Sequence, residues 1–525
     1  MINKLIKKKH FRRNLAGLRG AKILRDQNDP YHVLNIASDL TKINLKLKNS
    51  DFPNILVGSH ANIGEILLRQ IFLSSFLKLS TIIMQSIGSR KPIKYPLPIP
   101  WLKYICNSEH NIPVSFFTCR VLLIAASFKK IFIGLRQFLA FFTKEKNPVD
   151  TNFPYIMFLN LNANNLPRPK GHTSYDIISW YNKSSIRKQN IKTICAQVGK
   201  QRTPNTDNNL IIHHALFPKL DNFRQYLYFL LKGIQAFIVA IIGVLMGKWW
   251  YGYLYNESVK LHYVDSLLNE ALAEDYLLHH SNWFYKPLWC YEAEDKGSNV
   301  ILYFYSTNFE NILYNDYKMK EDHGLRIMTW NNFIVWDQEQ ENFFKRFCPN
   351  ATFTQTGYLD FSGIEYIVGA KDPVKRLAVF DVTPSRPVCF SRIGFAMAPY
   401  YSEELNLKFL EDIIKVFYND KWEVLWKQKR KVDRTRISEA FNQKQLNLVK
   451  NKVTIIDPIV SSRSILLVSD AVISIPFTST GIIGKVNGVP SVYYDPSGKV
   501  KLDKSHDISV LKNKNELSLW KSSLL

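Results

Sequence analysis

The chain has 525 residues, and domains usually hold about 100–200, so we expect two domains and an extension. Apolar residues make up 46% of it, which is ordinary for a globular chain with a hydrophobic core. The formal net charge is +25, and the first 150 residues, with 24 Lys or Arg against eight Asp or Glu, supply +16 of it. This basic region indicates an anionic partner, such as phospholipid head groups or nucleic acid, or else a solvated tail.

The spacing of the cysteines argues against a zinc protein, and the composition of the N-terminus argues against a secreted protein. The six cysteines are scattered, without the CxxC or Cys/His spacing of a zinc site, so we expect no zinc site and a reduced, cytosolic compartment. The first twenty residues are basic but lack the apolar stretch and the small-residue cleavage site of a secretory signal.

Two apolar stretches suggest contact with a membrane. Residues 114–142 are rich in Phe and Leu, but four Lys or Arg interrupt them, which predicts an amphipathic helix at a membrane interface. Residues 233–247 would form a helix of roughly 22 Å, shorter than the ~30 Å core of a bilayer. Their Lys, Trp and Tyr flank is typical of an interfacial anchor, and a buried core helix is the alternative. We therefore expect residues 1–150 to be a basic, mostly helical extension that attaches peripherally to an anionic membrane surface.

From residue 151 onward, strands alternate with helices, which predicts a parallel sheet. We expect residues 151–370 to form a Rossmann-like domain with a long helical insertion over about 221–280. Its predicted strands are 155–163, 191–198, 299–307, 331–337 and 351–360.

Residues 371–500 repeat the pattern and predict a second Rossmann-like domain, followed by a tail or helix over 501–525. Residues 402–420 have the spacing of an amphipathic helix, with Ser402 as the N-cap. Ligands of such domains bind at the carboxyl ends of the strands. The predicted strands are 376–384, 422–430, 453–460, 471–477 and 490–495.

A run of hydroxyl residues follows the strand predicted at 471–477. Thr478, Ser479 and Thr480 would lie at the start of a helix over 481–487, where backbone amides lack internal partners and favour an anion. Gly481 would let the backbone approach that anion closely. The sequence therefore predicts a phosphate-binding turn, although an N-cap alone would account for one of the hydroxyls.

Two neighbouring strand ends supply further candidates. Lys427 and Lys429 would face the same side of a strand and reach the phosphate together, unless they are simply solvated. The segment Asp457, Pro458 and Ile459 could present backbone groups to a nucleobase edge, or form a plain turn.

The residues SIPFTSTG, followed by GVPSVYYDP, resemble the surface-polysaccharide biosynthesis proteins named for a Pro-Phe-Thr-Ser motif, here Pro476, Phe477, Thr478 and Ser479. The segments VLWKQKRK, WNNFIVWD and TGYLDF also resemble this family, over roughly residues 150–500. The family is similar to GT-B glycosyltransferases, which bind a nucleotide-sugar between two Rossmann-like domains. The resemblance implies an α/β, GT-B-like fold and a bacterial cell-envelope pathway. The motif does not cover the basic, apolar first 150 residues, and it is from these residues that we expect a cytoplasmic protein peripheral on the inner face of the cytoplasmic membrane.

The resemblance also implies a mechanism, in which a CMP- or UDP-linked sugar moves to a cell-surface polysaccharide or its lipid-linked precursor. The hydroxyl turn and the lysines would neutralise the departing phosphate, so we expect neither a metal nor a cofactor. The acceptor needs a general base from the first domain. Asp176 is the first candidate and Asp337 the second, and each could instead begin a helix. His279 and His280, expected on a helix, are assigned no role.

Two other function classes stay open. Transfer of glycerol- or ribitol-phosphate from a CDP carrier would use a similar domain, but such enzymes carry His motifs where this chain has the lysines of LWKQKRK. A non-enzymatic, basic membrane- or nucleic-acid-binding protein would fit the charge. Since no nucleic-acid recognition motif is present, we expect no nucleic-acid partner.

Overall fold

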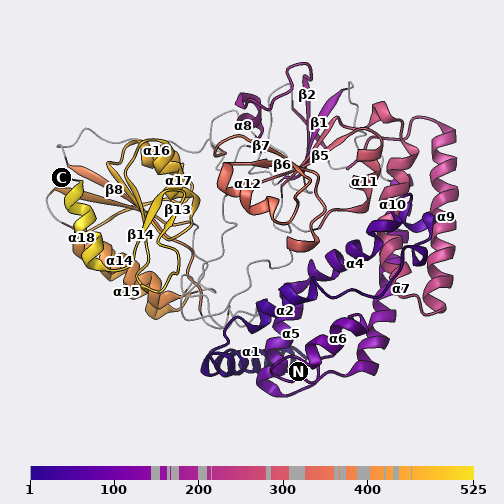
Figure 1. Cartoon of the computed structure of the whole chain (residues 1–525), viewed down its shortest axis with the longest axis horizontal. Helices are drawn as coiled ribbons and strands as arrows, with labels where there is room; N and C mark the ends of the chain where they lie inside the picture. The colour runs from indigo at the N-terminus through magenta and orange to yellow at the C-terminus, as the bar shows by residue number, and fades with distance from the viewer. Residues whose placement is uncertain are drawn as a thin grey trace.

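The structure is a computed structural model that describes residues 2–143, 154–161, 166, 177–198, 210–213, 216–279, 285–304, 306, 325–359, 366, 374–386, 389, 402–418, 421–429, 437–450 and 452–524. It contains an N-terminal helical region and two α/β domains, each built on its own sheet (Figure 1).

The N-terminal region consists of helices packed against each other and against the first sheet. Gly20 and Gly88 bring α1 and α5 into close contact, since a Cβ at Gly88 would lie 1.9 Å from the Ala16 carbonyl oxygen. Buried side chains of this region, such as Leu24 and Trp101, belong to the same core cluster as Tyr276 of the first sheet. The region expected to be an extension is thus an integral part of the first core. Its helices are α1 (Ile2–Asp26), α2 (His32–Leu40), α3 (Asn54–Val57), α4 (Gly64–Leu73), α5 (Phe76–Ser89), α6 (Ile99–Cys106) and α7 (Phe116–Thr143), with short 3-10 helices at Asn49–Asp51 and Ala61–Ile63.

The first sheet has seven parallel strands in the order β3-β2-β1-β4-β5-β6-β7. Side chains of β1 alternate between its two faces: Tyr155 and Met157 face the helical region, whereas Ile156 and Phe158 pack on the opposite side. The strands are β1 (Tyr155–Leu161), β2 (Thr193–Val198), β3 (Leu210–His213), β4 (Asp275–His279), β5 (Asn299–Tyr303), β6 (Asn332–Val335) and β7 (Thr352–Gln355). The helices between them are α8 (Ile177–Lys183), α9 (Phe223–Leu245), α10 (Trp250–Ser266), α11 (Leu288–Asp295) and α12 (Gln338–Lys345), with 3-10 helices at Asn269–Ala271 and Leu325–Ile327.

The helix expected over 221–280 is partly wrong. Helices α9 and α10 occupy about its first three quarters, but β4 follows and pairs with both β1 and β5. A short apolar run such as DYLLH suits either a strand or a buried helix, and here the sheet decides between them.

The second sheet also has seven strands, in the order β10-β9-β8-β11-β12-β14-β13, and all pairs are parallel except β13 with β14. Its strands are β8 (Lys375–Phe380), β9 (Trp422–Lys427), β10 (Thr454–Ile456), β11 (Ala471–Ser474), β12 (Ser491–Tyr494), β13 (Lys504–Ser505) and β14 (Ile508–Leu511). Its helices are α14 (Glu403–Phe417), α15 (Glu439–Val449), α16 (Ser462–Leu467), α17 (Ser479–Val486) and α18 (Lys514–Ser523). Ser402 caps α14 as predicted, because its hydroxyl accepts from the Leu405 amide at 3.2 Å.

Both sheets have doubly wound topology, in which the strand order reverses beside the first strand. The reversal lies between β1 and β4 in the first sheet and between β8 and β11 in the second. The α/β fold with two parallel sheets is therefore confirmed, and ligands of such sheets bind beyond the carboxyl ends of the strands at these points.

Helix α17 joins the two domains. Its Ile483 packs against the apolar cluster of the first domain that contains Trp336 and Leu359. At the end of α17, the side-chain amide nitrogen (Nδ2) of Asn487 donates to the Tyr358 hydroxyl at 3.2 Å. Since Tyr358 follows β7 and α17 follows β11, the two sheets present their carboxyl ends to each other.

Candidate active site

The turn between β11 and α17 has a strained backbone. Phe477 has a φ of 61°, in the left-handed region that bulky side chains rarely adopt. Its buried ring packs edge-on against Tyr493, with 5.8 Å between the ring centres. Burial of this ring holds the backbone in the turn that directs the start of α17 out of the sheet.

The start of α17 is not capped by its own N-cap side chain. Thr478 occupies the N-cap position, but its hydroxyl donates to the Ile475 carbonyl at 2.8 Å and accepts no hydrogen bond from a backbone amide of the helix. The Thr480 hydroxyl lies 3.3 Å from that of Thr478. The partial positive charge of the helix start is thus available to an anion, with hydroxyl groups beside it.

This turn faces the first domain. The Ser479 hydroxyl donates to the Ser306 hydroxyl at 3.3 Å, and Ser306 lies just beyond the end of β5. Thr478, Ser479 and Thr480 are each half-buried. The turn therefore lies between the carboxyl ends of the two sheets, where the sequence predicted a phosphate site.

Gly481 has a packing role that the sequence did not reveal. A Cβ at this position would lie 2.7 Å from Cε1 of Tyr493 and 3.0 Å from the Ser474 hydroxyl. The residue is needed because α17 packs closely on β12 and β11. Its predicted role in close approach to an anion stays a prediction.

A buried carboxyl follows β8, at the reversal point of the second sheet. Asp381 accepts from the Trp426 indole nitrogen at 3.2 Å and from the Lys429 backbone amide at 3.1 Å. Burial raises its pKa to about 7, although these hydrogen bonds and the charge of Lys427 act in the opposite direction. No sequence pattern marked this Asp, because its burial depends on the packing of β9 against β8.

The two predicted lysines, Lys427 and Lys429, do not lie on the same face of a strand. Lys427, the last residue of β9, is buried, and its ammonium donates to the Pro458 carbonyl at 3.2 Å. Burial lowers its pKa, while the charges of Asp381 and Asp457 partly oppose this. Lys429 lies beyond the strand end with an exposed side chain, so the expected common strand face is wrong.

The segment after β10 forms the plain turn that was the alternative prediction. The Asp457 carboxylate accepts from the Ile459 amide at 2.9 Å, and the Pro458 carbonyl is bonded to Lys427. These backbone groups are engaged within the protein, and their role toward a nucleobase stays a prediction.

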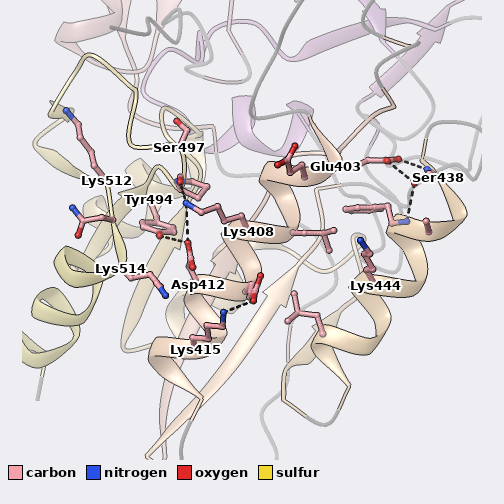
Figure 2. Close-up of a pocket in the computed structure, with 18 residues that line it drawn as sticks. Glu403, Lys408, Asp412, Lys415, Ser438, Lys444, Tyr494, Ser497, Lys512 and Lys514 are labelled. Atoms are coloured by element: carbon pink, nitrogen blue, oxygen red, sulfur yellow. Dashed lines mark hydrogen bonds and ion pairs between the residues drawn. The ribbon is translucent and has the colours of Figure 1, made fainter. Parts of the chain in front are cut away.

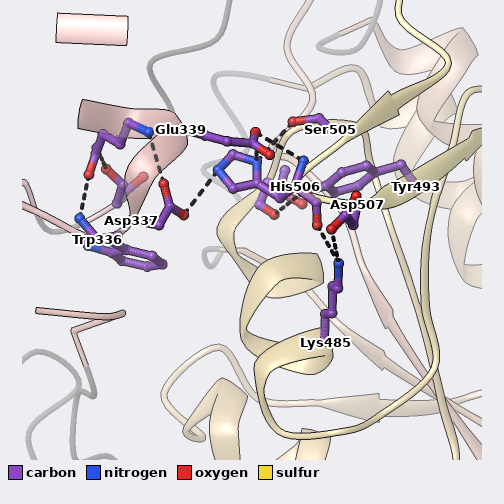
Figure 3. A network of polar contacts seen from close by, with 11 residues as sticks. Trp336, Asp337, Glu339, Lys485, Tyr493, Ser505, His506 and Asp507 are labelled. Atoms are coloured by element: carbon purple, nitrogen blue, oxygen red, sulfur yellow. Dashed lines mark hydrogen bonds and ion pairs between the residues drawn. The ribbon is translucent and has the colours of Figure 1, made fainter. Parts of the chain in front are cut away.

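Of the two predicted bases, Asp176 lies outside the described residues and Asp337 begins α12. One Asp337 oxygen accepts from the Gln340 amide at 2.9 Å, and the other lies 3.2 Å from Nε2 of His506 (Figure 3). Burial alone would raise the pKa of Asp337, but the hydrogen bonds from His506 and the helix amides lower it. The geometry therefore supports the alternative interpretation of Asp337 as a helix cap, and a lowered pKa makes a poor general base.

His506 links the two domains, a contact that the sequence did not reveal. Its backbone amide donates to the Glu339 carboxylate at 3.1 Å, and the next residue, Asp507, pairs with Lys485 of α17 at 3.3 Å (Figure 3). His506 and Asp507 both have left-handed φ angles, 52° and 55°, in the turn between β13 and β14. The predicted tail thus contributes a polar connection between the domains. We define the interdomain clasp as His506 with Asp337 and Glu339.

His279 lies at the strand-order reversal of the first sheet. It is the last residue of β4, beside β1, and pairs in register with Tyr303 of β5. Its expected place on a helix is wrong, while His280 lies outside the described residues. The imidazole thus lies at the point where ligands of doubly wound sheets bind.

Two other clusters of ionisable groups lie away from this site. Asp29, His32 and His110 approach one another closely enough to hold a metal ion, and their ion pairs lower the pKa of Asp29 to about 2 although burial opposes this. A groove of about 930 Å³ runs beside α14 (Figure 2). Its lysines alternate with acids, as in the Lys415–Glu411 pair at 2.6 Å, so the groove has little excess positive charge.

Comparisons with known proteins give one family match and several similar solved structures. The sequence profile of polysaccharide biosynthesis PFTS motif proteins matches residues 233–521. No curated protein sequence matches the chain.

Similar solved structures include TarM, with 12% identity over 51% of both chains and a TM-score of 0.28. The chain therefore spans about half the length of TarM. A second similar structure is that of trehalose-6-phosphate from E. coli bound with UDP-2-fluoro glucose. Its sequence identity is 11%, the match covers 70% of this chain and 91% of that one, and the TM-score is 0.34. HepE of Anabaena, in complex with UDP and glucose, has 8% identity over 71% of this chain and 89% of that one and a TM-score of 0.35.

Proposed function

Because the chain belongs to the family of polysaccharide biosynthesis PFTS motif proteins, we propose that it is a glycosyltransferase that uses a nucleotide-sugar donor. The acceptor in this proposal is a cell-surface polysaccharide or its lipid-linked precursor. One observation carries the proposal: the start of α17, at the family's motif, is uncapped by Thr478 and lies between the carboxyl ends of two parallel sheets.

The donor phosphates would bind at this helix start. Backbone amides of the first turn of α17 and the hydroxyls of Ser479 and Thr480 would donate to the phosphate oxygens. Lys427 would add positive charge from the end of β9, which lies on the far side of β8 from β11. As the bond between the sugar and the phosphate breaks, its electron pair moves to the phosphate oxygen, where these groups stabilise the new charge without a metal ion.

His279 is the described residue best placed to act as the base. It ends β4 at the carboxyl edge of the first sheet, and Ser306 follows β5 at the same edge. Its imidazole would accept the proton of the acceptor hydroxyl as that oxygen attacks the anomeric carbon. The predicted base Asp176, outside the described residues, is the alternative, and His279→Gln against Asp176→Asn distinguishes them by which variant loses turnover but keeps donor binding.

The proposal is tested by calorimetric titration of CMP, UDP, GDP and CDP into the full chain and into a Ser479→Ala/Thr480→Ala variant. We expect CMP or UDP to bind, with at least roughly tenfold weaker binding to the variant because two hydroxyl contacts are lost. A Ser522→Ala/Ser523→Ala variant on exposed positions of α18 should bind as the parent does. Binding of the nucleotide that is equal in all three proteins would overturn the phosphate assignment.

Two further measurements separate the alternatives. Turnover that persists in a chelator supports the metal-free mechanism, and turnover that a divalent ion restores contradicts it. Exclusive binding of CDP, with transfer of an alditol phosphate, would favour the phosphotransferase class instead.

A further inference from the structure

Helix α9 exposes an unusual amount of apolar surface. Among the described residues it is the one single helix long and apolar enough to cross a membrane, yet only 33% of its most apolar 18-residue window is buried. A bent pair over Ala61–Leu73 and Phe76–Ser89 passes the same test only if it is counted as one span. A core helix would have most of this surface covered.

The exposed apolar residues of α9 form a continuous stripe at helical spacing. Six of these residues, at helical spacing, are between 40% and 72% exposed. Small residues occupy the opposite face: a Cβ at Gly233 would lie 2.1 Å from the Phe138 ring of α7, and one at Gly243 would lie 2.0 Å from Tyr251. We define the α9 stripe as Leu227, Leu231, Ile234, Ile238, Ile242 and Leu245.

Helix α7 extends this surface. It packs beside α9 at the edge of the molecule, with Phe138 and Phe229 ring centres 5.0 Å apart (Figure 1). Its own exposed side chains include Phe117, which is 81% exposed, and Phe132. The two helices together present a broad apolar face, and contiguous faces of this kind mark interaction sites.

The charges on these helices have a single sign. Neither α7 nor α9 contains an Asp or Glu, whereas Arg120, Lys129 and Arg136 are exposed on α7 and Arg224 is exposed on α9. A second copy of the chain on this face would bring like charges together. An anionic surface would instead be attracted, and half-exposed Trp249 and Trp250 beyond α9 suit a membrane interface.

We propose that the α9 stripe and the exposed face of α7 dock the protein onto an anionic phospholipid bilayer, with α9 lying in the plane of the interface. The inner face of α9 remains packed on α7 and α10, as in the Phe229–Tyr263 contact at 5.2 Å. Spanning the bilayer would require α9 to leave both neighbours. The apolar stripe enters the boundary between head groups and acyl chains, while the arginines and lysines contact the phosphates.

The test is flotation of the full chain with vesicles of phosphatidylcholine, with or without phosphatidylglycerol. We expect binding to the anionic vesicles that weakens in high salt. A Leu231→Gln/Ile234→Gln/Ile238→Gln variant should lose at least tenfold in vesicle affinity while nucleotide binding is unchanged. A control, Val486→Gln/Leu519→Gln, replaces exposed apolar residues of α17 and α18 and should float as the parent does.

Four outcomes would overturn the proposal. In the first, the stripe variant floats as well as the parent. In the second, the parent fails to float and forms a dimer that the same substitutions dissociate. In the third, vesicle-bound parent protein resists extraction at alkaline pH, which would indicate a spanning helix. An Arg120→Gln/Lys129→Gln/Arg136→Gln variant should lose the preference for anionic vesicles, and an unchanged preference also contradicts the proposal. Because none of these readouts uses turnover, failure here leaves the glycosyltransferase proposal unaffected.

Discussion

Replacing Asp381 with Asn should remove a fall in stability that the protein undergoes between acid and mildly alkaline pH. This carboxyl is buried at the end of β8, and burial raises its pKa from 3.8 to about 7 despite hydrogen bonds from Trp426 and Lys429. The unfolded chain loses the proton near its ordinary pKa, whereas the folded chain keeps it until about pH 7. Stability therefore falls as pH rises through this window and levels off above it.

The size of the effect follows from the two pKa values of Asp381. A pKa of about 7 in place of 3.8 corresponds to about 4 kcal/mol over the whole window. Between about pH 5 and about pH 8, roughly 2.5 kcal/mol of this is lost. An Asn amide cannot accept from both Trp426 and Lys429, but that penalty is the same at every pH and does not alter the slope.

The assay is urea unfolding, followed by far-ultraviolet circular dichroism at several pH values, for the parent, Asp381→Asn and a control. Asp503→Asn is the matched control, because Asp503 is an exposed carboxyl of the same domain that pairs with Lys512. The control should keep the parent's pH slope, and Asp381→Asn should flatten it. Parallel slopes for the parent and Asp381→Asn would refute the raised pKa.

Three further predictions concern the packing, the interdomain clasp and the charge around α17. Gly481→Ala should lower the free energy of unfolding by about 1–3 kcal/mol, because its Cβ would meet Tyr493, whereas Val486→Ala on the exposed side of α17 should change it by under about 0.5 kcal/mol. If thermal unfolding of Gly481→Ala is normal but its nucleotide binding is lost, the packing role is wrong. A double-mutant cycle of Asp337→Asn and His506→Gln should give a coupling on the order of 1 kcal/mol at neutral pH that disappears in acid, where the Asp337 carboxylate is protonated. Because the folded-state pKa of Asp337 is lowered, its stabilising effect is present above its unfolded pKa and is lost as pH falls through the folded value; a coupling independent of pH would contradict the ion pair. Lys427→Met should weaken nucleotide-sugar binding by about tenfold and Lys429→Met by less than about threefold, as measured by calorimetry, and equal effects would restore the paired-lysine prediction.

The sequence predicts much of the fold where local pattern and tertiary context agree. The buried strands β1, β2, β8, β9 and β11 are short apolar runs bounded by turn residues, and α14 has a cap and an amphipathic face. Strand β4 was missed because its apolar run is equally compatible with the end of a helix. Only its pairing with β1 and β5 makes it a strand, and pairing between distant segments is invisible to a local pattern.

The candidate site is predicted less completely, because its chemistry depends on what surrounds each side chain. The hydroxyl turn was found, since three hydroxyl residues after a strand-ending proline are a local signal. The buried Asp381, the end of β4 at His279 and the partner of Asp337 were missed. Each is defined by a neighbour far away in sequence: β9 for Asp381, β1 for His279 and His506 for Asp337.

The central claim is that the first turn of α17 binds the phosphates of the donor. Hydrogen exchange of the Ser479 and Thr480 amides, measured with and without the CMP or UDP that binds, tests this most directly. The account predicts that these amides exchange more slowly with the nucleotide and are unaffected by the matching nucleoside, which lacks phosphate. Unchanged exchange at α17, with protection instead along the groove beside α14, would contradict it.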